Sequence, residues 1–214
     1  MVNRLLEEVE VRRVVVNNIV SLDGYYADEL GNPLVLDMDA AFDRANVESI
    51  ERAGVVLLGR DSFDGFSTYW PYIADAPPAS DPREARQRSD VNRALSRRYN
   101  ELPKVVISDR GPIDPDNPWA GTTIVIGRSH AASWLAASKA AGEDDILVFG
   151  SRRTWTALLA DSLVDKLHLM VSAVALGRGT RLFEQPVDLD LIDVRRFEGS
   201  TNVQLRYGVR SAST

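Results

Sequence analysis

Short runs of β-branched residues alternate with helical patterns along most of this chain, and this alternation constrains the fold more than any other feature. Eight runs have the length and the Val and Ile content of strands: 14–20, 55–58, 105–107, 123–126, 146–149, 167–174, 191–197 and 203–209. Helical patterns cover residues 39–53, 83–100, 130–141 and 152–160. Strands that alternate with helices form parallel crossovers, whereas the last three strands lack an intervening helix and should be antiparallel. The sequence therefore predicts an α/β fold with a mixed central sheet, a parallel core, antiparallel C-terminal strands and helices on both faces.

The segment 72–86 is rich in Pro, Ala, Asp and Ser, which is typical of a surface loop. We interpret it as an insertion between two strands, because the strands on either side are both needed to complete one sheet. A chain of 214 residues is long enough to bury one large core. We predict a single domain over residues 14–210, preceded by an N-terminal extension of residues 1–13.

The composition excludes several classes of function. A net charge of −6 argues against a broad basic face for nucleic acid or anionic lipid. The chain has no cysteine and only two histidines, His130 and His168, so we expect no metal site and no thiolate catalysis. The first residues lack the apolar stretch of a secretory signal, and no run of about 18 apolar residues occurs. We therefore expect a cytoplasmic protein without a membrane partner.

The apolar run 146–149 ends in Gly150 and Ser151 and passes directly into a helix that carries Arg152 and Arg153. A strand that delivers a glycine to a helix N-terminus presents backbone N–H groups to an anion, and guanidinium groups add forked donors for phosphate. The alternative is that the small residue serves the backbone turn alone. This segment thus indicates a candidate phosphate site.

A second strand ends in Gly59 and is followed by Arg60 and Ser62, which again combines free N–H groups, a cation and a hydroxyl. By itself this segment favours a plain strand-to-helix turn with a solvated arginine. The carboxyl ends of parallel strands meet at one crevice, so two such turns together predict a site for a diphosphate. Gly177 and Gly179 form a G-x-G, but they do not belong to a dinucleotide pattern G-x-G-x-x-G, because they lie between expected antiparallel strands. We expect these two glycines to supply positive φ in a loop that borders the substrate side of the cleft.

Several polar residues admit two interpretations. Asp23 is either a turn residue or a catalytic residue, and we expect its neighbour Leu22 to turn inward. Asn17 and Asn18 interrupt an apolar strand and need partners that a ligand would supply. His168 is interpreted as a sheet residue with satisfied partners. Trp155 either walls the substrate pocket or packs in the core.

Five segments in order resemble the dihydrofolate-reductase-like fold, and more closely the reductase domain of the bifunctional riboflavin-biosynthesis deaminase/reductase and its stand-alone relatives. These segments are 21–24 (SLDG), 57–62 (LLGRDS), 103–108 (PKVVIS), 148–151 (VFGS) and 175–183 (ALGRGTRLF). The similarity extends over residues 14–209. The chain lacks the His-x-Glu and paired cysteines of a zinc deaminase, so the resemblance implies a reductase alone.

The resemblance implies that a nicotinamide dinucleotide lies across the carboxyl ends of the parallel strands. The nicotinamide would lie near Asn18 and Ser21, and the adenosine near Ser108 and Arg110. The phosphates would be held by Gly59, Arg60, Asp61, Ser62, Gly150, Ser151, Arg152, Arg153 and Thr154.

The cofactor preference rests on opposing charges at the adenosine end. Asp61 and Asp109 favour a ribose hydroxyl over a 2′-phosphate, whereas Arg60 and Arg110 favour the phosphate. The resemblance implies NADPH, and NADH is the alternative.

The implied reaction is hydride transfer to a C=N or C=O group of a small heterocyclic or sugar-derived substrate, as for 5-amino-6-(5-phosphoribosylamino)uracil. In folate-reducing relatives an acid on the helix before the second strand binds the pterin, and Asp43, with Asp39 as its neighbour, lies in that region. Acids at a helix N-terminus are also favoured by the helix dipole alone. Dihydrofolate reduction and a nucleotide-binding module without turnover remain alternatives. The resemblance also implies a homodimer.

Overall fold

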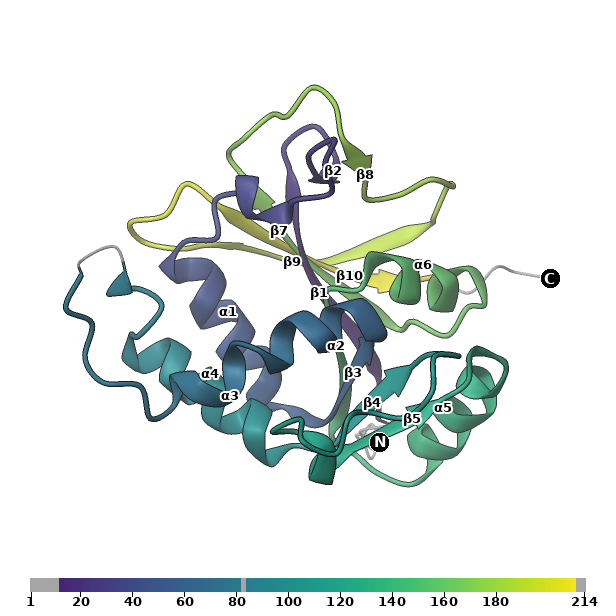
Figure 1. Ribbon diagram of the computed structural model, residues 1–214. Coiled ribbons are helices and arrows are strands. Elements are labelled where there is room, and N and C mark those ends of the chain that lie inside the picture. The colour runs from purple at the N-terminus through teal and green to yellow at the C-terminus, as the bar shows by residue number, and fades with distance from the viewer. Residues whose placement is uncertain (1–11, 82–83, 211–214) are drawn as a thin grey trace, which may run out of the picture.

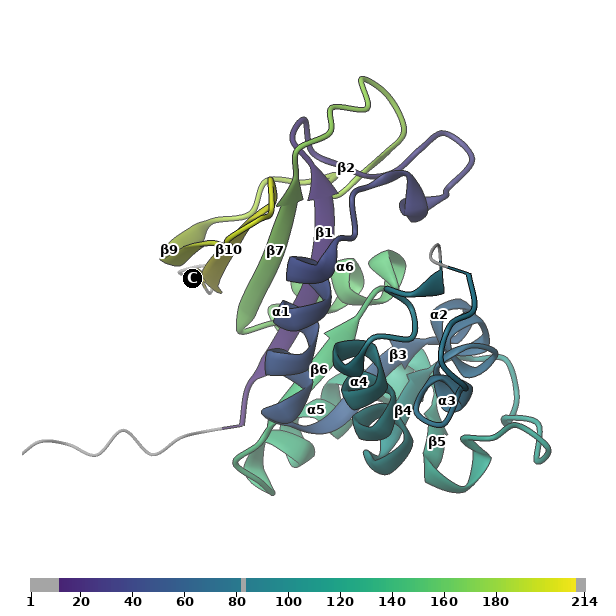
Figure 2. The ribbon, with the colours of Figure 1, turned by 90° about the vertical axis from the view of Figure 1, so that its left-hand side faces the viewer.

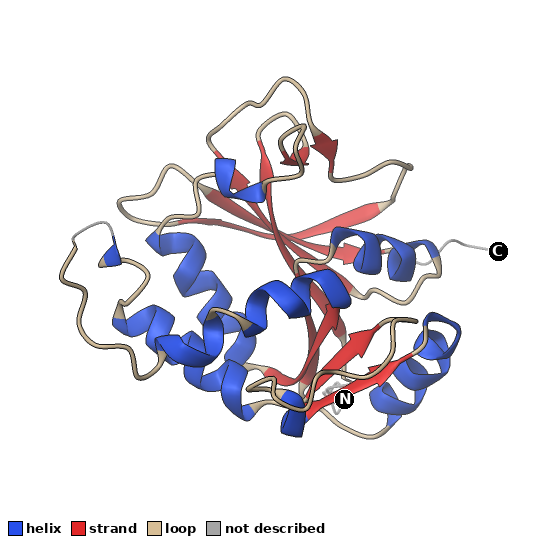
Figure 3. Ribbon diagram, viewed as in Figure 1, coloured by secondary structure: helices blue, strands red, loops and turns tan. Residues whose placement is uncertain are grey.

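The computed structural model describes residues 12–81 and 84–210, which form a large eight-stranded sheet and a small two-stranded one (Figures 1 and 3). The strands of the large sheet are β1 (Val14–Ser21), β3 (Ala53–Gly59), β4 (Lys104–Ile107), β5 (Thr123–Ile126), β6 (Asp145–Phe149), β7 (Lys166–Ser172), β9 (Leu189–Arg196) and β10 (Val203–Val209). Their order is β5-β4-β3-β6-β1-β7-β10-β9. Neighbours from β5 to β7 are parallel, whereas β10 is antiparallel to both β7 and β9. The predicted mixed sheet is therefore confirmed.

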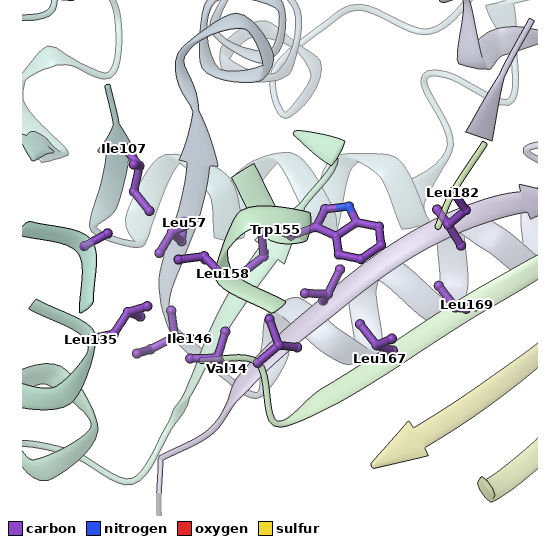
Figure 4. Close-up of a cluster of buried hydrophobic side chains, with 14 of the residues drawn as sticks. Val14, Leu57, Ile107, Leu135, Ile146, Trp155, Leu158, Leu167, Leu169 and Leu182 are labelled. Atoms are coloured by element: carbon purple, nitrogen blue, oxygen red, sulfur yellow. The ribbon is translucent and has the colours of Figure 1, made fainter. Parts of the chain in front are cut away.

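Helices cover both faces of this sheet, as predicted (Figure 2). The helices are α1 (Ala40–Glu51), α2 (Arg60–Ser67), α3 (Trp70–Ile73), α4 (Asp90–Glu101), α5 (Ala131–Ala140) and α6 (Arg152–Ala160), with 3-10 turns η1 (Pro33–Val35), η3 (Ala120–Thr122) and η4 (Arg128–His130). Ile50 of α1, Phe63 of α2 and Leu95 of α4 belong to one buried cluster. Leu135 of α5 and Trp155 of α6 belong to the cluster on the opposite face (Figure 4). The two clusters sandwich the parallel core.

The central strand β1 shows why an apolar run becomes a buried strand. All eight of its residues are buried. Val14 and Val16 point to the α5 and α6 face, whereas Val15 points to the opposite face, as the period of two in a strand requires. Asn17 and Asn18 are polar exceptions, so this strand places two buried amides in the middle of the sheet.

Two strands were not predicted from the sequence. Strand β2 (Tyr25–Ala27) pairs with β8 (Thr180–Arg181) in the small sheet, and both are too short to leave a periodic pattern. They approach closely because Gly179 has no side chain: a Cβ there would lie 3.1 Å from the Cα of Asp28 and closer still to the carbonyl of Ala27. The expected positive φ is also confirmed at both Gly177 (+73°) and Gly179 (+138°).

The helical boundaries differ around the predicted loop 72–86. Helix α3 overlaps its start, and α4 begins at Asp90 instead of residue 83. The reason for the later start is the side chain of Ser89, which accepts a hydrogen bond from the N–H of Asn92 and caps the helix. The predicted N-terminal extension lies outside the described residues except for Arg12 and Arg13.

Candidate phosphate-binding cleft

The two glycine turns of β3 and β6 lie side by side at the carboxyl edge of the sheet. The strands are parallel neighbours, with Leu57 opposite Val148, so their following helices α2 and α6 start at the same edge. The N–H of Gly59 donates a hydrogen bond of 2.7 Å to the hydroxyl of Ser151. The structure thus brings together the two turns that the sequence singled out.

Gly59 is required by this close approach. A Cβ at this position would lie 2.9 Å from the Oγ of Ser151 and closer still to the Oγ1 of Thr154. Both distances are below any ordinary carbon contact, so a larger residue would require the two hydroxyls to move, and the Cβ of Ser151, at 3.2 Å, would also have to shift. The absence of a side chain at Gly59 therefore permits the close packing of this turn against Ser151 and Thr154.

Gly150 and Ser151 both adopt left-handed backbone conformations, with φ of +55° and +51°. A non-glycine residue in this region is uncommon and costs of the order of 1 kcal/mol. Such strain is found where a functional constraint holds the backbone. At Ser151 the constraint is the turn that directs the first N–H groups of α6 into the cleft.

Both helices begin without a side-chain cap. The N-caps Gly59 of α2 and Ser151 of α6 make no side-chain hydrogen bond to their own helix. The first N–H groups of a helix have no intrahelical partners, and the helix dipole adds a partial positive charge there. The two neighbouring helix starts thus offer unpaired N–H donors of the kind that bind phosphate groups.

The arginines at this edge are held by other groups. Arg152 donates to Glu184 at 2.5 Å, and its Nε is buried without a protein partner. Arg153 is exposed. Arg60 donates to Asp64 and to the backbone carbonyls of residues 110–112, so it fastens the loop after β4 to α2. The arginines therefore supply only part of the positive charge that the sequence predicts at this edge, because Arg60 and Arg152 are paired with other groups.

The end of β1 contributes a buried amide with an unused donor. Asn17 lies opposite Phe149 in the parallel register, so Asn18 lies level with Gly150. Asn18 is 7% exposed, its Oδ1 accepts from the N–H of Ile19, and its Nδ2 has no protein partner. A buried donor without a partner is costly. A carboxamide such as that of nicotinamide would satisfy it.

Ser21 and Asp23 form a turn in which their side chains bond to each other and to backbone N–H groups. The hydroxyl of Ser21 donates to Asp23 and accepts from the N–H of Tyr25. Leu22 is 71% exposed, so the expectation that it turns inward is wrong. Its N–H donates to the carbonyl of Val174, which turns the side chain outward.

The carboxylate of Asp23 holds the loop after β7. It accepts hydrogen bonds from Ser21 and from the N–H groups of Leu176 and Gly177. These donors, with the Ser21 hydroxyl first, lower the pKa of Asp23 to about 2. A carboxylate that stays ionised at neutral pH cannot donate a proton, so these contacts give Asp23 a loop-anchoring role, and a catalytic role of another kind stays a prediction.

The two acids of α1 are committed to structural partners. Asp39 is the N-cap, which accepts from the N–H groups of Ala41 and Phe42 and from the hydroxyl of Ser200. Asp43 is 5% exposed and accepts two hydrogen bonds of 2.7 Å from Arg86. A third comes from the side chain of Asn92 at 3.1 Å.

These contacts correct the predictions of a substrate-binding Asp39 and a catalytic Asp43. The reason is that the donors of a pterin would have to displace a guanidinium that already fills the Asp43 carboxylate.

The other residues predicted to bind substrate, Trp155, Gly177 and Gly179, lie in different parts of the structure. Trp155 is fully buried, and its ring packs edge-on against Phe183 at 5.9 Å, so it is a core residue in this structure (Figure 4). Gly177 lies in the loop that Asp23 anchors. Gly179 serves the contact between β2 and β8. Sequence reasoning did not identify Tyr26, which is partly buried against the same hydrophobic cluster as Trp155. Burial raises the pKa of Tyr26, and the positive charge of Arg152 offsets part of this increase.

Two shallow hollows flank the ends of β4 and β5. One, of about 510 Å³, is lined by Ser108, Asp109, Gly111, Pro112, Ile113, Ala120, Thr123, Val125 and Gly127. The other, of about 470 Å³, is lined by Val125, Ile126, Gly127, His130, Ser133 and Trp134. Ser108 and the backbone N–H of Arg110 are joined by a 3.0 Å hydrogen bond. Of the two predicted adenosine residues, Ser108 therefore lines the first hollow, whereas Arg110 is not among its lining residues.

Across the described ranges 12–81 and 84–210, no group of three or more His, Cys, Asp or Glu side chains is arranged to hold a metal ion. The helices of these ranges include none that is long and apolar enough to cross a membrane.

Comparison with known proteins gives a family and a fold. A model of the RibD C-terminal domain matches residues 12–205. No protein with a curated description matches the sequence. The fold is dihydrofolate-reductase-like, since similar solved structures include both RibD proteins and a dihydrofolate reductase.

Three of these structures illustrate the likeness. A Shewanella sp. PV-4 protein named for riboflavin biosynthesis is 20% identical, with a TM-score of 0.63 over 93% of this chain and 99% of that one. RibD from Acinetobacter baumannii is 19% identical, with a TM-score of 0.62 over 94% of this chain and 58% of that one. Dihydrofolate reductase from Enterococcus faecalis, solved with NADP(H) and RAB-propyl, is 14% identical, with a TM-score of 0.56 over 93% and 97%. The chain spans just over half the length of the RibD protein.

Proposed function

Because the chain belongs to the RibD C-terminal domain family, we propose that it is a nicotinamide-dependent reductase of the riboflavin-pathway type. Its substrate is a small heterocyclic or sugar-derived molecule with a C=N or C=O group. The observation that carries this proposal is the convergence of two uncapped helix N-termini on the Gly59–Ser151 contact. Membership of a biosynthetic family supports a cytoplasmic location.

The described residues fit a dinucleotide. The N–H groups at the starts of α2 and α6 would hold the pyrophosphate, and the buried unpaired donor of Asn18 would hold the carboxamide of the nicotinamide. When bound, the reduced nicotinamide supplies the hydride. The hollow beside Ser108 has room for the adenine. The resemblance favours NADPH, with NADH as the alternative.

The protein contributes alignment more than acid catalysis. Hydride addition leaves a nitrogen or oxygen that needs a proton. Asp23 stays ionised, and the carboxylates of Asp39 and Asp43 are filled by other donors. We infer that water at the cleft mouth delivers this proton.

The contacts of Asp43 also bear on the alternative of dihydrofolate reduction. Pterin binding needs a carboxylate with free acceptors, and that of Asp43 holds Arg86 through two 2.7 Å hydrogen bonds. Dihydrofolate reduction is therefore disfavoured. A binding module without turnover would keep the phosphate cleft and lack any reaction with substrates.

Two measurements test this proposal. Thermal shift with NADH and NADPH should raise the melting temperature with at least one of them, because a ligand that binds only the folded state stabilises it. Loss of nicotinamide absorbance should then occur with the phosphoribosylamino-uracil and should be absent with dihydrofolate. Binding without any turnover across imines, carbonyls and pterins would favour the binding module, and turnover of dihydrofolate would overturn our ranking.

We further propose a homodimer. Strand β9 forms the edge of the sheet (Figure 2), and its Leu191, Ile192 and Val194 are each more than half exposed. Leu191 is opposite Tyr207 and Val194 is opposite Leu205 in the β9–β10 pairing, so these four side chains share one face. An exposed apolar face on an edge strand supports association with a second copy. Light scattering should give twice the chain mass, and Leu191→Asp should give a monomer; a monomeric wild type would contradict the proposal.

A further inference from the structure

Tyr26 is a titratable side chain at the carboxyl end of the sheet whose hydroxyl the fold leaves unused. It belongs to β2, which follows the turn after β1 and pairs with β8. The pKa of Tyr26 responds to burial and to the charge of Arg152, and no hydrogen bond from any described residue reaches its hydroxyl. The neighbouring Tyr25 differs, since its hydroxyl donates to the carbonyl of Gly177 at 3.3 Å. The phenol of Tyr26 is therefore free to donate to a ligand.

The two tyrosines of β2 have different surroundings. The ring of Tyr25 lies under the guanidinium of Arg181, whose central carbon is 4.9 Å from the ring centroid. Tyr26 instead packs against the hydrophobic cluster that contains Trp155 of α6 and Leu182, the residue after β8. Figure 4 shows Trp155 and Leu182 within this cluster, on the face of the large sheet that α6 covers. The side chain of Tyr26 therefore lies on the α6 side of the molecule.

Arg152 relates the Tyr26 phenol to the start of α6. It is the first residue of this helix and lies one turn before Trp155, so the two side chains are neighbours on the helix surface. The side chain of Arg152 is only 13% exposed. Although it also donates to Glu184, its charge lowers the pKa of Tyr26 against the effect of burial. Such an interaction weakens with distance, so the phenol lies near the helix start that the phosphates of a nucleotide would meet.

Asn18 of β1 lies on the same face of the sheet. Val16 and Val20 belong to the cluster against which Tyr26 packs, and Asn18 alternates with them along the strand. The Nδ2 of Asn18 is the buried donor without a protein partner that fits the carboxamide of a nicotinamide. A nicotinamide held by Asn18 would therefore have the Tyr26 phenol on the same side of the sheet, where the carbon that receives the hydride must also lie.

The reduction needs a proton donor beside the nitrogen or oxygen that hydride addition leaves basic. The carboxylates of Asp23, Asp39 and Asp43 are occupied by other donors. A tyrosine keeps its proton at neutral pH, and burial raises the pKa of Tyr26 further. The guanidinium of Arg152 stabilises the phenolate that remains once the proton has left.

We propose that Tyr26 donates the proton to the substrate when its C=N or C=O group is reduced. The inference rests on the proposed function, since it concerns the same reaction. The carbon of the C=N group gains the hydride with its two electrons, and the nitrogen takes over the electron pair of the π bond. This nitrogen then bonds to the Tyr26 proton as the O–H bond breaks, and a carbonyl oxygen does the same in a C=O substrate. Water at the cleft mouth returns a proton to the phenolate, so water is the source of the proton and Tyr26 is its last carrier.

The experiment compares Tyr26→Phe with Tyr25→Phe, the matched control, since each variant loses one hydroxyl from the same strand β2. Urea denaturation should show little change for Tyr26→Phe, because its hydroxyl has no hydrogen bond to lose. Calorimetry with NADH and NADPH should give wild-type dissociation constants for both variants. With 5-amino-6-(5-phosphoribosylamino)uracil as substrate, kcat should fall about a hundredfold or more in Tyr26→Phe and stay at the wild-type value in Tyr25→Phe.

A second readout needs no turnover. In the presence of the oxidised nucleotide, the same uracil compound should bind about 2- to 10-fold more weakly to Tyr26→Phe than to the wild type, because one hydrogen bond to the substrate is lost. An undiminished kcat in Tyr26→Phe, or equal losses in the two variants, overturns the inference and leaves the reductase proposal standing. A wild type that binds neither nucleotide, or does not oxidise it with this compound, contradicts the proposed function, and the inference fails with it.

Discussion

Replacement of Gly59 by alanine tests the packing that defines the cleft. The new Cβ would lie 2.9 Å from the Oγ of Ser151 and closer to Thr154, so these two side chains at the start of α6 have to shift. Overpacking of this kind costs about 1–3 kcal/mol. Loss of the hydrogen bond from the Gly59 N–H to Ser151 costs about 1 kcal/mol more.

A smaller contribution to the free energy of unfolding of this variant acts in the opposite direction. The backbone of Gly59, with φ of −81° and ψ of 159°, is one that alanine adopts without strain. Alanine therefore stabilises by about 0.4–1 kcal/mol through the reduced entropy of the unfolded chain. The expected net loss in free energy of unfolding is about 1–3 kcal/mol.

Urea denaturation followed by tryptophan fluorescence measures this loss, and calorimetry with the preferred nucleotide measures binding. Binding should weaken at least tenfold, because the N–H groups of the two helices no longer converge. Gly65→Ala is the matched control: Gly65 lies in the same helix α2, and a Cβ there would meet nothing within 4 Å, so the variant should be slightly stabilised and bind normally. If Gly59→Ala matched Gly65→Ala in both stability and binding, our account of the cleft would be refuted.

Three other changes have distinct expected outcomes. Trp155→Ala should lower the free energy of unfolding by about 3–5 kcal/mol in chemical denaturation, because the ring is fully buried; a loss below about 1 kcal/mol would contradict its core role. Asp43→Asn should cost about 1–2 kcal/mol of stability and leave the nucleotide dissociation constant unchanged, since Arg86 is partly exposed and can rehydrate; weaker nucleotide binding in calorimetry would argue against this assignment. Burial, with the charge of Arg206, lowers the pKa of His168 from 6.5 to about 3, so between these pH values the unfolded chain takes up a proton that the folded chain does not. The contribution of His168 to the free energy of unfolding should therefore be complete above pH 6.5 and fall toward pH 3. Urea melts of His168→Gln should show a flatter dependence of stability on pH over that window.

The large sheet was predictable because its signal is local. Each central strand is an apolar run between turn residues, and runs such as 14–20 stay buried on both faces whatever their neighbours are. The small sheet gave no such signal, since β2 and β8 are held by the close approach at Gly179 and not by any periodic pattern. Helix α4 likewise begins where Ser89 caps it, which periodicity alone cannot locate.

In the candidate site, too, some features were predictable from the sequence and others were not. The sequence by itself determined that glycine turns follow two parallel strands, because strand, glycine and helix are neighbours in the chain. Only the tertiary structure decided what each charged side chain does: Asp23 anchors a loop, Asp39 caps a helix, Asp43 holds Arg86, and Asp61 holds Arg110. These partners are contributed mainly by segments far away in the sequence. The ionisation and availability of a carboxylate depend on the donors that the fold brings to it, and these are absent from any local pattern.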